Sequence, residues 1–363
     1  MMKKLIVLIC AMALVMGVFA ATAMAESGKP LKILIVTSSG VDDGNFNQDC
    51  YNGLQAFLAD HADCSVKDVK ESDLAELIPT VERLAGDYDV FVLPGFNFGG
   101  IGDIVLANPD KYFLVVDSTI QDSEGNPVTA NNVYTMTYTE QEGGFMAGLA
   151  AALTSKSNKV AEINGMPFPS NTNYQFGFMG GVKYANEKFG TAVECVEIPS
   201  FSGGDGVGGN YVGNFADPAT GKVVAETLIG DGCDVIFAAA GESGNGALTA
   251  VKEADGVWFI GCDVDQYDDG AKGDGNVVLT SALKVMHLDV QRELENIYNG
   301  TFAGTDALLG ADSDSTGFVS EEGRQQLSDD ALAKLAECYD LMKKGEIVPP
   351  TTADAVNDFP GLK

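Results

Sequence analysis

Polar and aromatic side chains gather directly after several apolar runs that predict β-strands. The run at 31–37 is followed at 38–48 by serines, aspartates, asparagines and a phenylalanine, and Asp117, Asp263 and Lys284 each stand near the end of a further predicted strand. Open α/β sheets bind ligands at the carboxyl ends of their strands. The pattern therefore predicts a ligand site built from carboxylates, amides, aromatic rings and one ammonium group.

The elements that position these residues form two successive sets of β- and α-segments. The first set has predicted strands at 31–37, 65–70, 88–94, 112–117 and 132–138, with helices at 45–59, 73–85 and 100–107. The second has strands at 159–164, 192–198, 234–240, 257–263 and 277–282, with helices at 140–153, 174–189, 217–229, 244–253, 286–298 and 328–343. Continuous apolar strands separated by helices indicate parallel sheets covered on both faces. We expect an α/β protein of two doubly wound lobes, because a single barrel would need fewer units.

The N-terminus predicts export. Lys3 and Lys4 precede an apolar stretch at 5–21, and a small–x–small pattern ending at Ala25 matches the site that signal peptidase cleaves. We expect residues 1–25 to be removed and the mature protein to be periplasmic or extracellular. Cys10 follows an isoleucine, where a lipid-modified cysteine needs a small residue, so no clear lipobox is present.

Composition excludes several classes of function. The 363 residues include 52 acidic and 22 basic side chains, a formal net charge of −30. Nucleic acids and anionic membrane surfaces require clustered basic residues, so neither is an expected partner. The two histidines, His61 and His287, lie in no recognisable catalytic context. The glycine-rich stretch at 203–209 lacks dinucleotide-binding spacing, and 312–323 departs from a calcium loop at its last position. We therefore expect no cofactor and no metal.

Four motifs carry a family resemblance. In chain order they are DGNFNQ at 43–48, EQEG at 140–143, FADPATGK at 215–222 and GCDVDQ at 261–266. Together they resemble the basic membrane protein family of substrate-binding lipoproteins, the nucleoside receptors of ABC importers, over about residues 31–317. The resemblance implies a periplasmic-binding-protein type I fold, with three crossovers and a ligand cleft at the hinge. The missing lipobox is a departure that puts membrane tethering in doubt.

The resemblance also sets the expected organisation and partners. We expect an N-terminal lobe of residues 31–138 plus about 265–285, and a C-terminal lobe of residues 139–264 plus about 286–345. Residues 346–363 would form a C-terminal tail. The implied protein is a monomeric, non-enzymatic receptor, with a small-molecule nucleoside as ligand and an ABC permease as membrane partner.

A purine nucleoside has two π faces and a hydrogen-bonding edge, which call for aromatic walls and polar groups. We expect Phe46 and Phe215 to be the walls, one from each lobe, although helical spacing also allows Phe46 to be core. Packing against a helix cap is the structural alternative for Phe215. By resemblance to the family, Asp43, Asn45 and Asn47 would face the edge of the base.

The ribose needs acceptors for its hydroxyl groups. An ionised carboxylate can accept hydrogen bonds from two adjacent hydroxyls, and the resemblance gives this role to Asp263. Lys284 would pair with the carboxylates and donate to the ligand. Asp117 is a weaker candidate from the hinge side.

Other functions remain open on the sequence alone. The ligand of a receptor could instead be riboflavin or a sugar. A secreted nucleoside hydrolase could use Asp42 or Asp43 as its base, and a surface adhesin would bind no nucleoside. These alternatives differ in their ligand and in whether the free base is released.

Overall fold

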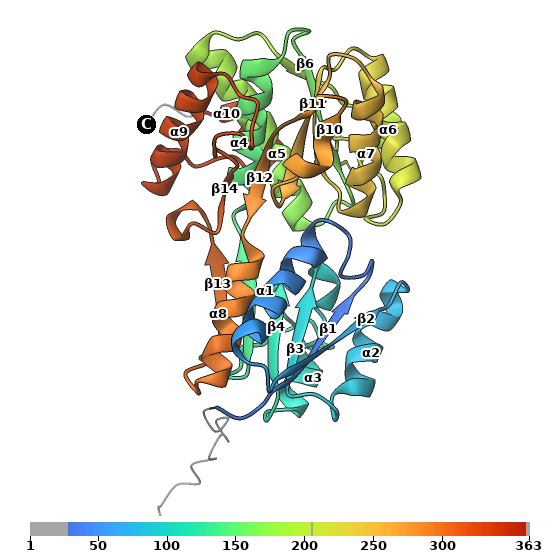
Figure 1. The fold of residues 1–363 in the computed structure, drawn as a ribbon, viewed down its shortest axis with the longest axis vertical. Helices are drawn as coiled ribbons and strands as arrows, with labels where there is room; N and C mark the ends of the chain where they lie inside the picture. Colours follow the sequence, from blue (N-terminus) through green and yellow to red (C-terminus); the bar gives the residue numbers. More distant parts are fainter. Residues whose placement is uncertain (1–27, 205, 361–363) are drawn as a thin grey trace, which may run out of the picture.

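The structure, a computed structural model, describes residues 28–204 and 206–360. It consists of two α/β lobes placed one above the other along the long axis of the molecule (Figure 1). The predicted pair of doubly wound lobes is confirmed. The proposed signal peptide, residues 1–25, lies outside the described residues.

The first lobe is built on a parallel six-stranded sheet in the order β13-β5-β4-β3-β1-β2. Helices α1 and α8 cover one face, and α2 and α3 cover the other. The inner strands β1, β3 and β4 are apolar on both sides because both of their faces are buried. The bounds are β1 Lys32–Thr37, α1 Phe46–Asp60, β2 Ser65–Lys70, α2 Leu77–Leu84, β3 Val90–Pro94, α3 Gly102–Ala107, β4 Tyr112–Val116, β5 Val133–Tyr138, α8 Met286–Tyr298 and β13 Thr305–Leu309.

The second lobe repeats this plan in the order β14-β12-β9-β8-β6-β7, with β14 antiparallel at its edge. Helices α4, α5 and α9 cover one face, and α6 and α7 cover the other. A small hairpin, β10–β11, and α10 complete it. The bounds are α4 Glu140–Thr154, β6 Lys159–Asn164, α5 Pro169–Phe189, β7 Glu194–Cys195, α6 Pro218–Gly230, β8 Val235–Ala239, α7 Glu242–Glu253, β9 Trp258–Asp263, β10 Ala271–Lys272, β11 Gly275–Asn276, β12 Val278–Lys284, β14 Thr316–Phe318, α9 Asp329–Lys343 and α10 Ala353–Asp358.

Glycines set the close packing of α4 against α5. A Cβ on Gly148 would lie 2.0 Å from the carbonyl oxygen of Phe178, and one on Gly144 would lie 2.3 Å from that of Tyr174. Larger side chains at these positions would push the helices apart. The contact therefore fixes α5, and with it the position of the helix N-terminus at the cleft.

The chain crosses between the lobes three times, after β5, after β12 and after β13. Glu142 connects the first and third crossovers: its Oε2 accepts hydrogen bonds from Thr139 Oγ1 at 2.6 Å, Ala311 N at 2.8 Å and Thr316 Oγ1 at 2.6 Å. One carboxylate thus holds together segments that are far apart in sequence.

The expected lobe boundaries need correction. Residues 265–285 were expected in the first lobe, but β12 pairs with β9 in the second sheet. Residues 286–345 were expected in the second lobe, but α8 packs beside α1 and β13 pairs with β5 in the first (Figure 1). The crossover falls directly after Lys284, and an apolar pattern does not show which of two sheets a strand joins.

Other local differences are smaller. The region between the predicted helices at 286–298 and 328–343, read as a loop, contains β13 and β14, and the strand predicted at 192–198 is reduced to β7. The C-terminal tail forms α10 and packs against α5, where Lys183 Nζ donates to the carbonyl oxygen of Val356 at 3.0 Å. Among the helices described, none is long and apolar enough to span a bilayer.

Candidate functional site

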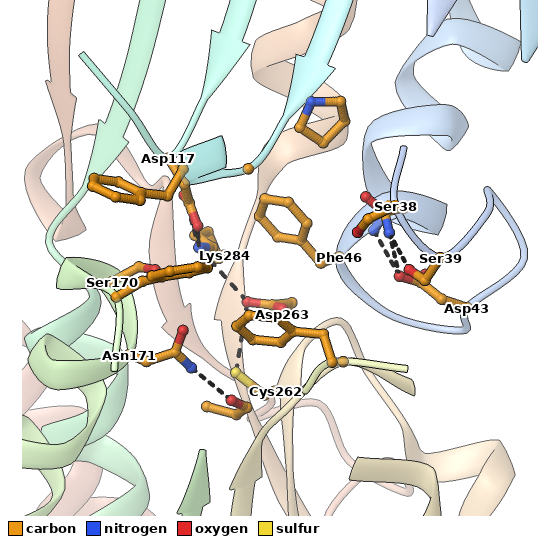
Figure 2. A pocket seen from close by; sticks show the side chains of 18 of the residues that line it. Ser38, Ser39, Asp43, Phe46, Asp117, Ser170, Asn171, Cys262, Asp263 and Lys284 are labelled. Atoms are coloured by element: carbon orange, nitrogen blue, oxygen red, sulfur yellow. Dashed lines mark hydrogen bonds and ion pairs between the residues drawn. The ribbon is translucent and has the colours of Figure 1, made fainter. Parts of the chain in front are cut away.

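A cavity lies between the lobes, at the carboxyl ends of strands from both sheets. The empty space between its lining atoms, part of it open to solvent, is about 670 Å³. Each lobe contributes half of the lining residues (Figure 2): Ser38, Ser39, Asp43, Phe46, Asn47, Pro94, Gly95, Phe96, Asn97 and Asp117 from the first, and Phe168, Ser170, Asn171, Tyr174, Phe215, Ala239, Gly241, Cys262, Asp263 and Lys284 from the second.

Two aspartates occupy corresponding places in the two lobes. Asp117 follows β4 and Asp263 ends β9, and these are the third strands in the two sheet orders. Both have left-handed backbone, with φ of 63° and 67°. This conformation is uncommon for residues other than glycine, and aspartate and asparagine tolerate it better than most. The same turn at each strand end places a carboxylate at the cavity.

Lys284, at the end of β12, connects these carboxylates. Its Nζ lies 2.9 and 2.8 Å from the two carboxylate oxygens of Asp117, 3.6 Å from Glu140 Oε1 and 4.0 Å from Asp263 Oδ1 (Figure 2). Only 1% of Lys284 is exposed. Because Asp117 belongs to the first lobe and Lys284 to the second, the ion pair spans the hinge.

The cluster contains one ammonium group and three carboxyl groups. Burial raises the pKa of Asp263 to about 6 and that of Glu140 to about 7, although Lys284 opposes both shifts. Burial by itself would lower the pKa of Lys284, but Asp117, Asp263 and Glu140 together raise it well above its ordinary value. The lysine therefore stays charged, and Asp263 and Glu140 hold a proton more readily than exposed acids do.

Asp263 keeps one oxygen available. Its Oδ1 accepts a hydrogen bond from Tyr174 Oη at 3.1 Å. Among the described residues, no hydrogen-bond donor is directed at its Oδ2. Asp117, in contrast, uses both oxygens on Lys284. Asp263 is thus the carboxylate that can accept hydrogen bonds from a ligand.

Phe46 and Phe215 line the cavity from opposite lobes. The Nζ of Lys284 lies 4.9 Å from the centre of the Phe46 ring. Phe215 packs over Gly165, where a Cβ would lie 2.2 Å from the ring carbons. It also stacks on Phe168 with ring centres 5.9 Å apart. The glycine and the second ring hold Phe215 in place as a cavity wall.

Asp43 lines the cavity but its carboxylate serves its own helix. Oδ1 accepts from the backbone N–H groups of Asn45 at 3.0 Å and Gln48 at 2.9 Å, and Oδ2 accepts from Asn47 N at 3.1 Å and Asn47 Nδ2 at 2.9 Å. Burial raises the pKa of Asp43, and these donors oppose the shift. Asn47 Nδ2 also donates to Ser39 Oγ at 2.7 Å, so Asn47 has its amide oxygen left for other contacts.

Asn45 was expected at the base edge, and it is the one of the eight predicted residues that is not part of the cavity lining. Its Nδ2 reaches the second lobe, 3.2 Å from the carbonyl oxygen of Gly241 and 3.3 Å from Asn245 Oδ1. Asn245 Nδ2 in turn donates to the carbonyl oxygen of Asp43 at 3.1 Å. Asn45 therefore contacts the opposite lobe rather than the cavity.

The sequence prediction missed the N-terminal turn of α5, which brings Phe168, Ser170, Asn171 and Tyr174 to the cavity. The helix was expected to begin at residue 174, but it begins at Pro169. Proline is favoured in the first turn of a helix, so this residue was an available signal. The helix that follows the first strand of the other lobe, α1, contributes its N-terminus in the same way.

Within the described chain, no three His, Cys, Asp or Glu side chains are arranged to hold a metal ion. The six described cysteines are free thiols, two of them only partly buried. Of the acids that line the cavity, Asp117 and Asp263 converge on Lys284 instead. The arrangement therefore offers hydrogen bonding and stacking to an organic ligand.

Two lobes joined by three crossovers, with a polar and aromatic cavity between them, define a type I periplasmic-binding-like solute-binding protein. A family model described as "ABC transporter substrate-binding protein PnrA-like" (Bmp) matches residues 31–202 and 206–350. The chain belongs to this family, as the four sequence motifs indicated.

Comparisons with individual proteins agree with membership of this family. The chain is 30% identical over 333 residues to the ABC transporter nucleoside-binding protein BmpA of Lactococcus lactis, covering 84% of this chain and 87% of that protein. It is 30% identical over 346 residues to a CD4+ T-cell-stimulating antigen of Listeria monocytogenes, covering 90% and 89%. A solute-binding protein of an Aeropyrum pernix ABC transporter system has the same fold, with a TM-score of 0.76, 23% identity and coverage of 91% and 96%.

Proposed function

We propose that this protein is the exported receptor of an ABC importer, which binds a nucleoside, preferably a purine nucleoside, between its lobes and delivers it to the permease. The observation that carries the proposal is the pairing, in one cavity, of two phenylalanine walls with a lysine-held aspartate that has a free oxygen. The name of the Lactococcus lactis relative, a nucleoside-binding protein, supports it.

The base would lie between Phe46 and Phe215. Stacking on an aromatic ring contributes about 1–3 kcal/mol per base. Ser39 and Asn47 lie at the first-lobe side of the cavity and are hydrogen-bonded to each other. The Ser39 hydroxyl can donate and the Asn47 amide oxygen can accept, which suits the adjacent donor and acceptor groups on a purine edge.

The ribose would lie at Asp263 and Lys284. The free Oδ2 of Asp263 can accept from hydroxyl groups, while Tyr174 and Lys284 hold its other oxygen. Asp117, Glu140 and Asp263 make the site unfavourable for a nucleoside phosphate. The phosphate would add negative charge to a cluster that has three carboxyl groups and only one ammonium group. A neutral nucleoside adds no such charge.

The proposed receptor does not hydrolyse its ligand. Of the two acids that a hydrolase could use as base, Asp42 is not part of the cavity lining, and both oxygens of Asp43 already accept hydrogen bonds from α1. Ligand binding would instead stabilise the closed arrangement of the lobes, which the permease then recognises.

A thermal-shift panel tests the proposal. Adenosine, guanosine, inosine, uridine, adenosine monophosphate, riboflavin and ribose are added separately to the protein, each at several concentrations. A ligand at 100 times its Kd adds about 2.7 kcal/mol to the free energy of unfolding. We expect the purine nucleosides to raise Tm most, with no release of free base. A shift with riboflavin or ribose alone, or release of free base, would contradict the proposal.

A further inference from the structure

Asn171 lies in the first turn of α5, where it lines the cavity and is only 5% exposed. Tyr174 follows one turn later on the same helix and donates to Asp263 Oδ1. Residues three apart on a helix lie on the same face. Asn171 therefore stands beside the part of the cavity that Asp263 occupies.

The orientation of the Asn171 amide is fixed by its partners. Its Nδ2 lies 2.7 Å from the carbonyl oxygen of Ala239 and 3.3 Å from Asn164 Oδ1. A backbone carbonyl can only accept a hydrogen bond. If the amide were reversed, two oxygen atoms would face each other at 2.7 Å. Both hydrogens of the amide are thus used on the protein, and the amide cannot rotate to offer a donor to the cavity.

The amide oxygen of Asn171 is left without a donor among the described residues. It is also not enclosed by the protein, because it is absent from the fully buried atoms that lack a partner. Figure 2 shows the nitrogen of Asn171 at a dashed hydrogen bond and the oxygen turned the other way, toward Ser170. An acceptor in a confined site is costly to leave unpaired when a ligand displaces water from it.

We infer that Asn171 is a specificity-determining residue, whose fixed amide oxygen accepts a hydrogen bond from a ribose hydroxyl of the ligand. The position beside Asp263 favours the sugar over the base. The inference rests on the proposed function, since it assumes a nucleoside bound with its ribose at Asp263. It adds a requirement that Asp263 and Lys284 do not impose: one particular hydroxyl must be present to satisfy a neutral, immobile acceptor.

A cycle of protein and ligand changes tests this contact. The Kd values of adenosine, 2′-deoxyadenosine, 3′-deoxyadenosine and 5′-deoxyadenosine are measured by calorimetry with the wild-type protein and with Asn171→Ala. We expect Asn171→Ala to weaken adenosine about tenfold, which corresponds to about 1.4 kcal/mol. One deoxy analogue should bind both proteins equally, because it lacks the hydroxyl that Asn171 accepts. The other two should show the full tenfold loss.

Two further variants keep the result interpretable. Thr172→Ala changes the next residue, which is not part of the cavity lining, and should leave all four Kd values unchanged. Asn171→Leu keeps a side chain of similar size but has no polar atom, and the Ala239 carbonyl still accepts from Gly165 N at 3.1 Å. It should therefore reproduce the pattern of Asn171→Ala even if the alanine variant folds poorly.

The outcomes separate the inference from the proposed function. If the wild-type protein binds adenosine but both Asn171 variants bind it equally well, the inference is wrong and the proposed function stands. The same holds if all four ligands lose the same factor, which would indicate a contact with the base. If the wild-type protein binds none of the four nucleosides, the proposed function and the inference fall together.

Discussion

Replacing Lys284 by methionine removes the single positive charge among three buried acids. At an effective dielectric constant of about 20, unit charges about 4 Å apart attract by about 4 kcal/mol. Asp117, Glu140 and Asp263 all lie within 4.0 Å of Lys284 Nζ. Removing one partner of a buried ion pair typically costs about 3–5 kcal/mol. We therefore expect Lys284→Met to lower the free energy of unfolding by about that amount at neutral pH.

The loss of stability caused by Lys284→Met should depend on pH. In the folded protein, burial raises the pKa of Asp263 to about 6 and that of Glu140 to about 7, while unfolded carboxyl groups titrate near about 4. The folded state thus binds more protons over this interval, and stability falls as pH rises through it. Because Lys284 lowers the pKa of both Asp263 and Glu140, these two pKa values rise further without it. The loss caused by Lys284→Met should therefore be smaller near about pH 5 than near about pH 8.

Urea unfolding at the two pH values measures the effect. Lys222→Met is the matched control, because Lys222 pairs with Glu226 and Glu253 at the surface, and exposed pairs contribute about 0–1 kcal/mol. A second variant, Lys284→Met with Asp117→Asn, should recover part of the loss by removing one acid. The reasoning is refuted if Lys284→Met costs no more than Lys222→Met, or if its cost grows as pH falls.

Three further predictions concern a wall of the cavity, the buried Glu162 and the partly exposed His287. Phe215→Ala should weaken adenosine binding by about 1–3 kcal/mol, measured by calorimetry, whereas Leu308→Ala on an exposed strand edge should leave the Kd unchanged. Glu162 is fully buried with neither carboxyl oxygen hydrogen-bonded, and burial raises its pKa to about 8. The folded state then holds a proton that the unfolded chain releases, so wild-type Tm should fall between about pH 6 and pH 9 more steeply than that of Glu162→Gln; equal slopes would contradict this. The hydrogen bond to Asp49 raises the pKa of His287, so its contribution is full below the unfolded value of about 6.5 and is lost as pH rises through the folded one. His287→Gln should lower Tm at acidic pH and have little effect at alkaline pH, and a reversed order would be evidence against the assignment.

Residue types and motifs were sufficient to predict seven of the twenty residues that line the cavity. Asp117 and Asp263 could be placed because each follows a buried strand, and the carboxyl ends of parallel strands share one edge of a sheet. Phe46 and Phe215 could be placed because both lie in motifs that carry the family resemblance and a purine calls for aromatic walls. These positions depend on local pattern, which a sequence displays directly.

The features that the sequence did not predict depend on which segments, distant in the chain, come into contact in the fold. The swap that puts β12 in the second lobe and α8 in the first leaves no local trace, because both segments would bury the same apolar residues in either lobe. Asn45 has the residue type of a ligand contact, yet the distance to Gly241 and Asn245 across the cleft determines its role. Asn171 was missed because the start of its helix was placed too late.

A crystal structure of the protein with adenosine tests the central claim most directly. The account predicts the base between Phe46 and Phe215 and ribose hydroxyls on Asp263 Oδ2, with the lobes closed around the ligand and the Lys284–Asp117 pair intact. An empty cavity at saturating adenosine, or adenosine bound outside the cleft, would contradict it.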